Sequence, residues 1–63
     1  MRNIDIEEQD EMLILHTIEL DGYSYLRIKD GKADTSLLDE FACKRTFDCN
    51  LSELKEYIKK RGY

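Results

Sequence analysis

Residues 12–29 read MLILHTIEL, then DG, then YSYLRIK. Both apolar runs are rich in residues that favour β-strands, and Asp-Gly separates them. A two-residue hairpin turn of type I′ needs positive φ at both central positions, which Asp-Gly accommodates well. The stretch therefore predicts a β-hairpin over residues 11–30, with Asp21 and Gly22 as its turn.

The predicted pairing sorts the hairpin side chains into two faces. A two-residue turn places Leu20 opposite Tyr23 and Ile18 opposite Tyr25. Because strand side chains alternate between faces, one face is predicted to be the core side. That face carries Leu13, Leu15, Thr17, Leu26 and Ile28. The other is unusually apolar for a solvent-facing surface, with Ile14, Ile18, Leu20, Tyr23 and Tyr25. It is expected either to pack on another part of the chain or to form an interface.

Two further elements follow the hairpin. Residues 36–46 favour a short helix, because Ser36 can cap it and apolar residues recur at helical spacing; alternation over residues 41–47 keeps a third antiparallel strand as the alternative. Asn50 as N-cap and an apolar stripe predict a C-terminal helix over residues 51–61. The predicted fold class is therefore α+β, with the hairpin packed on this helix. The predicted core is Leu13, Leu15, Leu26, Ile28, Leu38, Phe41, Leu54 and Ile58.

The chain has 63 residues, which is room for one small domain. Residues 11–63 are expected to form it. Residues 1–10 are acidic and lack sustained apolar periodicity, so a mobile segment is favoured over a short edge strand carrying Ile4 and Ile6. A small core gives marginal stability, and small scaffolds commonly gain stability from a partner subunit. We therefore expect a homodimer formed through the second face of the hairpin or its edge.

Charge is segregated along the chain. Seven of the first 22 residues are acidic and one is basic, whereas residues 44–63 carry six basic and three acidic side chains. Such polarity shapes association more than it shapes folding.

Catalytic and metal-binding patterns are weak. His16 is the only histidine, and no third group is indicated that would orient it toward Cys43 or Cys49. The same three residues are too few for a structural zinc site, and Cys-x5-Cys is not its usual spacing. We therefore expect no enzymatic activity and no cofactor. No apolar run is long enough to span a membrane and no signal peptide is evident, which favours a cytoplasmic protein with reduced thiols.

These observations favour a non-enzymatic protein-binding module, an inhibitor or regulator that occupies a partner's surface. The carboxylates of the N-terminal region could engage the basic groove of a nucleic-acid-binding protein. The predicted anchors are Ile14, Ile18, Tyr23 and Tyr25, and the predicted acidic rim is Glu7, Glu8, Asp10 and Glu11. In size, charge and hairpin-plus-helix layout the chain resembles the small acidic inhibitors of phages and mobile elements, such as inhibitors of uracil-DNA glycosylase. This resemblance assigns no residue.

The alternative is a small DNA-binding transcriptional regulator. Its C-terminal helix would contact phosphates through Lys55, Lys59 and Lys60. A net charge of −4 works against phosphate neutralisation, so nucleic acid is the less favoured partner.

Overall fold

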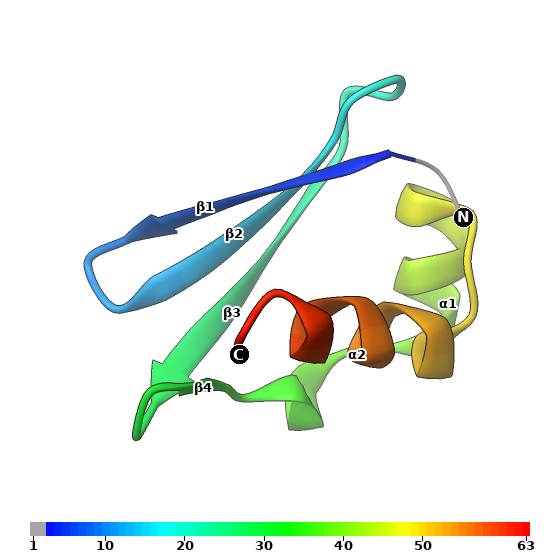
Figure 1. Ribbon diagram of the computed structural model, residues 1–63. Helices are drawn as coiled ribbons and strands as arrows, with labels where there is room; N and C mark the ends of the chain where they lie inside the picture. Colours follow the sequence, from blue (N-terminus) through cyan, green and yellow to red (C-terminus); the bar gives the residue numbers. More distant parts are fainter. Residues whose placement is uncertain (1–2) are drawn as a thin grey trace.

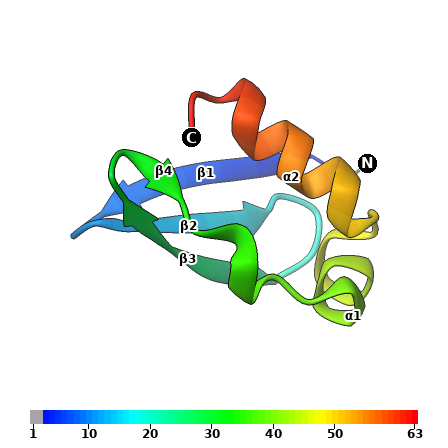
Figure 2. The ribbon, with the colours of Figure 1, turned by 90° about the horizontal axis from the view of Figure 1, so that it is seen from below.

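The computed structural model describes residues 3–63. An antiparallel sheet of four strands, in the order β1-β2-β3-β4, forms one layer. The helical segments form a second layer on one face of this sheet, and α2 lies across it (Figures 1 and 2). The elements are β1 (Ile4–Gln9), β2 (Met12–Thr17), β3 (Tyr23–Lys29), β4 (Lys32–Ala33), the 3-10 turn η1 (Thr35–Leu37), α1 (Glu40–Ala42), the π-helical segment η2 (Cys43–Phe47) and α2 (Leu51–Lys60).

The predicted α+β fold class is confirmed. The C-terminal helix is present, beginning at Leu51 as predicted and ending at Lys60. The short helix predicted near residues 36–46 is also present, as α1 continued by η2, so the alternative of a third strand there is wrong. Asp39 caps this helix, because its carboxylate accepts a hydrogen bond from the N–H of Phe41 at 2.8 Å.

The N-terminal region differs from the mobile segment favoured by the sequence. Ile4–Gln9 forms β1, the edge strand, and pairs antiparallel with β2. The two are joined by a two-residue turn in which Asp10 and Glu11 have φ of 50° and 62°. Acidic side chains are compatible with this position, because an edge strand keeps one side in water. Residues 1–2 lie outside the described residues.

The predicted hairpin forms, but Asp21-Gly22 is not a two-residue turn. β2 ends at Thr17, residues 18–22 form a longer loop, and Tyr25 lies opposite Ile14 instead of Ile18, a register shift of four residues. Because four is even, each side chain within the strands keeps its predicted face.

Packing against the helical layer accounts for the longer loop. A Cβ atom on Gly22 would lie only 2.7 Å from Cγ2 of Thr46, so the loop passes close to η2. The hydroxyl of Thr17, at the end of β2, donates to the main-chain oxygen of Thr46 at 3.0 Å. The loop is therefore shaped by its contact with the helical layer as well as by its own turn preference.

The core lies between the sheet and the helical layer. Leu13, Leu15, Leu26, Leu54 and Ile58 are buried there, as predicted. The predicted Ile28 and Leu38 are only partly buried and pack at the margin of the core. The prediction for Phe41 is wrong, because its side chain is 69 % exposed.

The phase of the helix explains this error. Capping by Asp39 starts α1 at Glu40, later than the predicted start at residue 36. Phe41 then falls in the first turn and is exposed, while Cys43 and Phe47, about one turn apart, are fully buried. Cys49 is also buried, and both cysteines are free thiols that pack as small apolar side chains.

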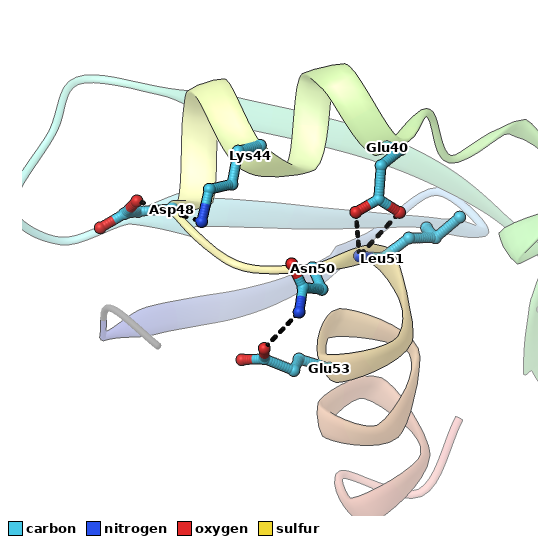
Figure 3. Close-up of polar contacts among 6 residues, drawn as sticks. All are labelled: Glu40, Lys44, Asp48, Asn50, Leu51 and Glu53. Atoms are coloured by element: carbon cyan, nitrogen blue, oxygen red, sulfur yellow. Dashed lines mark hydrogen bonds and ion pairs between the residues drawn. The ribbon is translucent and has the colours of Figure 1, made fainter.

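A carboxylate from α1 caps the start of α2. Glu40 accepts a hydrogen bond from the N–H of Leu51, with distances of 3.3 and 3.2 Å to its two oxygens (Figure 3). Asn50 occupies the predicted N-cap position but does not cap with its side chain, which donates instead to Glu53 at 2.9 Å (Figure 3). The corner between the two helices is thus held by Glu40, and α2 is fixed relative to α1.

Two tyrosines fasten the C-terminal region to β1. The hydroxyl of Tyr57 donates to the main-chain oxygen of Ile4 at 2.7 Å. The hydroxyl of Tyr63 donates to the carboxylate of Glu8, also at 2.7 Å. The edge strand is therefore attached to α2 on the same side of the sheet that carries the core.

Candidate functional site

The face of the sheet turned away from the helical layer carries a mixed aromatic and acidic surface, which we call the outer face. Alternation along the strands and the observed register define its membership. Its residues are Asp5, Glu7 and Gln9 from β1, Met12, Ile14 and His16 from β2, and Tyr23, Tyr25 and Arg27 from β3. The helical layer packs on the other face, so nothing within residues 3–63 forms a second layer over this one.

Three ring side chains form a row on the outer face. The ring centres of Tyr23 and Tyr25 are 5.0 Å apart, with an interplanar angle of 72°, an edge-to-face arrangement. The ring of His16 lies 6.2 Å from that of Tyr23. Tyr23 is 56 % exposed and Tyr25 is 53 % exposed. The row therefore presents about half of each tyrosine to solvent in a defined mutual geometry.

Ile14 forms an apolar floor beside the tyrosines. It lies opposite Glu7 on β1 and opposite Tyr25 on β3. Its side chain is only 8 % exposed, yet it does not belong to the core on the other side of the sheet. Neighbouring side chains of the outer face cover it, so this face has a small apolar centre of its own.

Carboxylates lie along one side of this centre. An oxygen of Glu7 lies 3.3 Å from Nε2 of His16, and Asp5 is the cross-strand partner of the same histidine. Partial desolvation raises the pKa of the Tyr25 phenol, and interactions with Tyr23 and then with the negative charge of Glu7 add to the increase. Tyr25 is therefore a neutral phenol at physiological pH, next to an acidic edge.

Part of the predicted contact set comes together on this face. The four residues that do so are Glu7, Ile14, Tyr23 and Tyr25. They occupy one cross-strand row and its immediate neighbour, so a single partner could contact all of them.

The other predicted contact residues lie elsewhere. Glu8 projects from the opposite face of β1, where it accepts the hydrogen bond from Tyr63. Asp10 and Glu11 form the turn between β1 and β2, at the end of the strands opposite to the loop of residues 18–22. Ile18 is 65 % exposed in the loop that follows β2, beyond the paired part of the strand.

Sequence reasoning missed Asp5 as a member of the outer face. The sequence favours a mobile segment over residues 1–10, whereas pairing of β1 with β2 places Asp5 and Glu7 on one side of the sheet. His16 lies on the face that alternation predicts for it, and the observed register places it opposite Tyr23. Strand-forming Ile4 and Ile6 were the available signal for β1.

A shallow hollow extends the exposed apolar surface toward α1. Its volume is about 370 Å³, and its lining includes Leu20, Tyr23, Phe41 and Arg45. Leu20 is 42 % exposed and Phe41 is 69 % exposed. Because Tyr23 belongs to both surfaces, apolar contact area runs from Tyr25 round the end of the sheet to α1.

The histidine and the two cysteines, which would be needed for catalysis or zinc binding, lie on opposite sides of the sheet. His16 is on the outer face, whereas Cys43 and Cys49 are buried in the core on the other side of the sheet. Burial raises the pKa of both thiols and keeps them protonated. Among residues 3–63 no group of three or more His, Cys, Asp or Glu side chains could hold a metal ion. That part of the chain also has no helix long and apolar enough to cross a membrane.

The chain matches no protein-family model, no curated protein and no solved structure.

Proposed function

We propose that the protein is a non-enzymatic protein-binding module, which inhibits or regulates a partner by occupying that partner's surface with the outer face. The supporting observation is the uncovered row of Tyr23 and Tyr25 beside the apolar floor at Ile14. Tyrosine is enriched at the energetic centres of interfaces, because it combines a large apolar ring with a polar hydroxyl. A partner that covers this row removes apolar surface from water.

The charge of the outer face favours a cationic partner. Asp5 and Glu7 place negative charge along one side of the aromatic row, and Arg27 is at the other end of β3. A guanidinium or ammonium group over a tyrosine ring is attracted by the π face, and a neighbouring carboxylate adds a charge-assisted hydrogen bond. The basic groove of a nucleic-acid-binding protein supplies such groups, and we propose this class of partner. We expect the encounter in the cytoplasm, where free thiols such as Cys43 remain reduced.

Affinity capture with matched variants tests this function. Lysate of the native host is passed over immobilised wild type, Tyr25→Phe, Tyr25→Leu and Leu37→Ala. Leu37 is 79 % exposed on η1 and lies outside the outer face, so it controls for loss of an exposed apolar side chain. We expect wild type, Tyr25→Phe and Leu37→Ala to retain the same protein, because phenylalanine keeps the π face. Tyr25→Leu should bind it about tenfold more weakly.

Equal retention by Tyr25→Leu and wild type would contradict the proposal.

Glu7→Gln provides a second readout on the captured partner. Because rim charges act mainly on encounter, this variant should slow association and flatten its salt dependence while changing dissociation little.

A second copy of the chain is the competing occupant of the outer face, since the small core predicts a homodimer. Sedimentation equilibrium of the purified protein decides between them. A dimer that Tyr25→Leu dissociates and Leu37→Ala does not would assign the outer face to self-association. A monomer, or a dimer unaffected by Tyr25→Leu, leaves this face available for the partner.

A further inference from the structure

A second surface, remote from the outer face, gathers positive charge in a groove. The groove lies between α2 and the segment formed by β4 and η1, which run past each other in Figure 1. Its volume is about 370 Å³, within the range of sites that hold small organic molecules. Its cationic lining residues are Lys32 from β4 and Lys55 and Lys59 from α2.

The three lysines converge because of the fold. Lys55 and Lys59 are four residues apart on α2 and therefore lie on one side of the helix. Lys32 is on β4, the edge strand next to β3, and the turn at residues 30–31 brings β4 back toward α2. Within residues 3–63 none of the three ammonium groups forms an ion pair, so their charge is available to a ligand.

The remaining lining groups suit a phosphate ester. Thr35 and Ser52 add hydroxyl groups that can donate to phosphate oxygens. Ala33 and Ile58 supply an apolar floor, and Ile58 is 1 % exposed. Positive charge, hydroxyl donors and an apolar floor in one groove match a ligand with a charged head and an organic body.

Two groups near the groove disfavour a bound anion: the carboxylate of Glu56 and the main-chain oxygen of Tyr63. Glu56 lines this groove and also the neighbouring hollow on the other side of α2, so it lies at the border between them. The main-chain oxygen of Tyr63 is already engaged by the N–H of Ala33 at 3.1 Å, and the Tyr63 hydroxyl is turned to Glu8. Three lysines against the single carboxylate side chain of Glu56 leave the side-chain charge of the groove positive.

We propose that this groove binds a small phosphate monoester, with Lys32, Lys55 and Lys59 neutralising the phosphate and Ala33 and Ile58 contacting the organic group. The site is separate from the outer face, and the inference does not depend on the proposed protein-binding function. It accounts for the basic side of α2 without requiring a long nucleic-acid footprint, which an acidic protein disfavours.

The experiment is a titration of the ¹⁵N-labelled protein followed by amide chemical shifts. The probes are phenyl phosphate, inorganic phosphate and benzyl alcohol. We expect phenyl phosphate to cause saturable shifts at Thr35, Ser52 and Lys59 with millimolar affinity. Inorganic phosphate should bind more weakly at the same amides, and benzyl alcohol should not bind measurably. Absence of saturable shifts at these amides would overturn the proposal.

Charge-matched variants locate the site, and their amide spectra also report that each variant is folded. Lys59→Ala should weaken phenyl phosphate binding about fivefold. The factor is modest because the ion pair between the Lys59 ammonium group and the phosphate is exposed to solvent. Lys60→Ala makes the same charge change outside the groove and should leave the affinity unchanged. Glu56→Gln should tighten binding, which a merely structural role of Glu56 does not predict. Equal weakening by Lys59→Ala and Lys60→Ala would reduce the effect to general charge and overturn the site.

A duplex DNA titration separates the two sources of phosphate. If the duplex binds through these lysines with a log-salt slope of several units, while phenyl phosphate does not compete, the groove reads a nucleic-acid backbone and the small-molecule assignment is wrong. If phenyl phosphate displaces the duplex or the duplex does not bind, the assignment stands.

Discussion

The two faces of the sheet use their large side chains in opposite ways. The covered face buries Leu13, Leu15 and Leu26 almost completely under the helical layer, whereas the outer face leaves Tyr23 and Tyr25 half exposed. Only one side of the sheet is therefore needed to hold the fold together. The outer face is free to carry a chemistry that folding does not demand, and a change there should alter binding more than stability.

The largest test of this division empties the covered face. Phe47→Ala removes a fully buried ring and should cost about 3–5 kcal/mol of the free energy of unfolding. That is close to the whole stability of a domain this small, so urea denaturation followed by circular dichroism should find the variant largely unfolded. Phe41→Ala is the matched control, since Phe41 is 69 % exposed, and should change stability by about 0.5 kcal/mol or less. Similar losses in both variants would contradict the assigned helix phase.

A smaller loss is expected where the loop after β2 meets the helical layer. Gly22→Ala would place a methyl group 2.7 Å from Cγ2 of Thr46, an overpacking that should cost about 1–3 kcal/mol. Thr46→Ser removes that methyl group and keeps the main-chain oxygen that Thr17 contacts. A double-mutant cycle measured in urea should show the two changes together costing less than their sum. Simple additivity would mean that the loop does not pass as close to η2 as described.

A third change tests the attachment of α2 to the edge strand. Tyr57→Phe removes the hydrogen bond to the main-chain oxygen of Ile4 and should cost about 1 kcal/mol. Tyr63→Phe removes an exposed hydrogen bond to Glu8 and should cost less, because water replaces that bond more easily. Thermal unfolding of the two variants gives the order directly. The reverse order would show that the part-buried bond to Ile4 contributes little.

The smallest effect is expected at Asp34, the N-cap residue of η1, and it depends on pH. The hydroxyl and the N–H of Ser36 hold the pKa of the Asp34 carboxyl below its usual value. A carboxyl with a lowered pKa in the folded state contributes stability above its unfolded-state pKa, and this contribution is lost as the pH falls through the folded-state value. Between neutral and strongly acidic pH, wild type should therefore lose slightly more thermal stability than Asp34→Asn, whose amide does not titrate. If wild type and Asp34→Asn lost thermal stability identically as the pH falls, the acid sensitivity would come from other carboxylates.

The features that were predictable from the sequence are those repeated along a segment. Alternation identifies the core side of β2 and β3 through Leu13, Leu15 and Leu26, and a register error of four residues leaves that result intact. Likewise Leu54 and Ile58, four residues apart, identify the buried side of α2. A repeated pattern tolerates local mistakes because each residue supports its neighbours.

Features that depend on one local signal were not predictable. Asp21-Gly22 is the stronger turn sequence, yet the two-residue turn between β1 and β2 is made by Asp10 and Glu11. The turn preference of Asp21-Gly22 is overridden by the close approach of Gly22 to Thr46, a tertiary contact that no local sequence pattern encodes. The position of β1 likewise depends on pairing with β2, since acidic residues disfavour a strand in isolation.

The candidate outer face was therefore only partly predictable. Tyr23, Tyr25 and Ile14 follow from alternation within the hairpin. Their acidic neighbours depend on β1. The sequence alone does not give the register of this strand and groups Glu7 with Glu8, which faces the other side. Long-range pairing decides which charges reach the aromatic row.

The hydrogen bond from Tyr57 to Ile4 joins residues 53 positions apart. On the ribosome β1 is made before the helix that holds it in place. The nascent hairpin therefore leaves the exit tunnel with its core side uncovered, and the native arrangement can close only after α2 has emerged. Such late closure of sequence-distant contacts delays folding until α2 has been synthesised and exposes the hairpin to chaperones or to other nascent chains in the meantime.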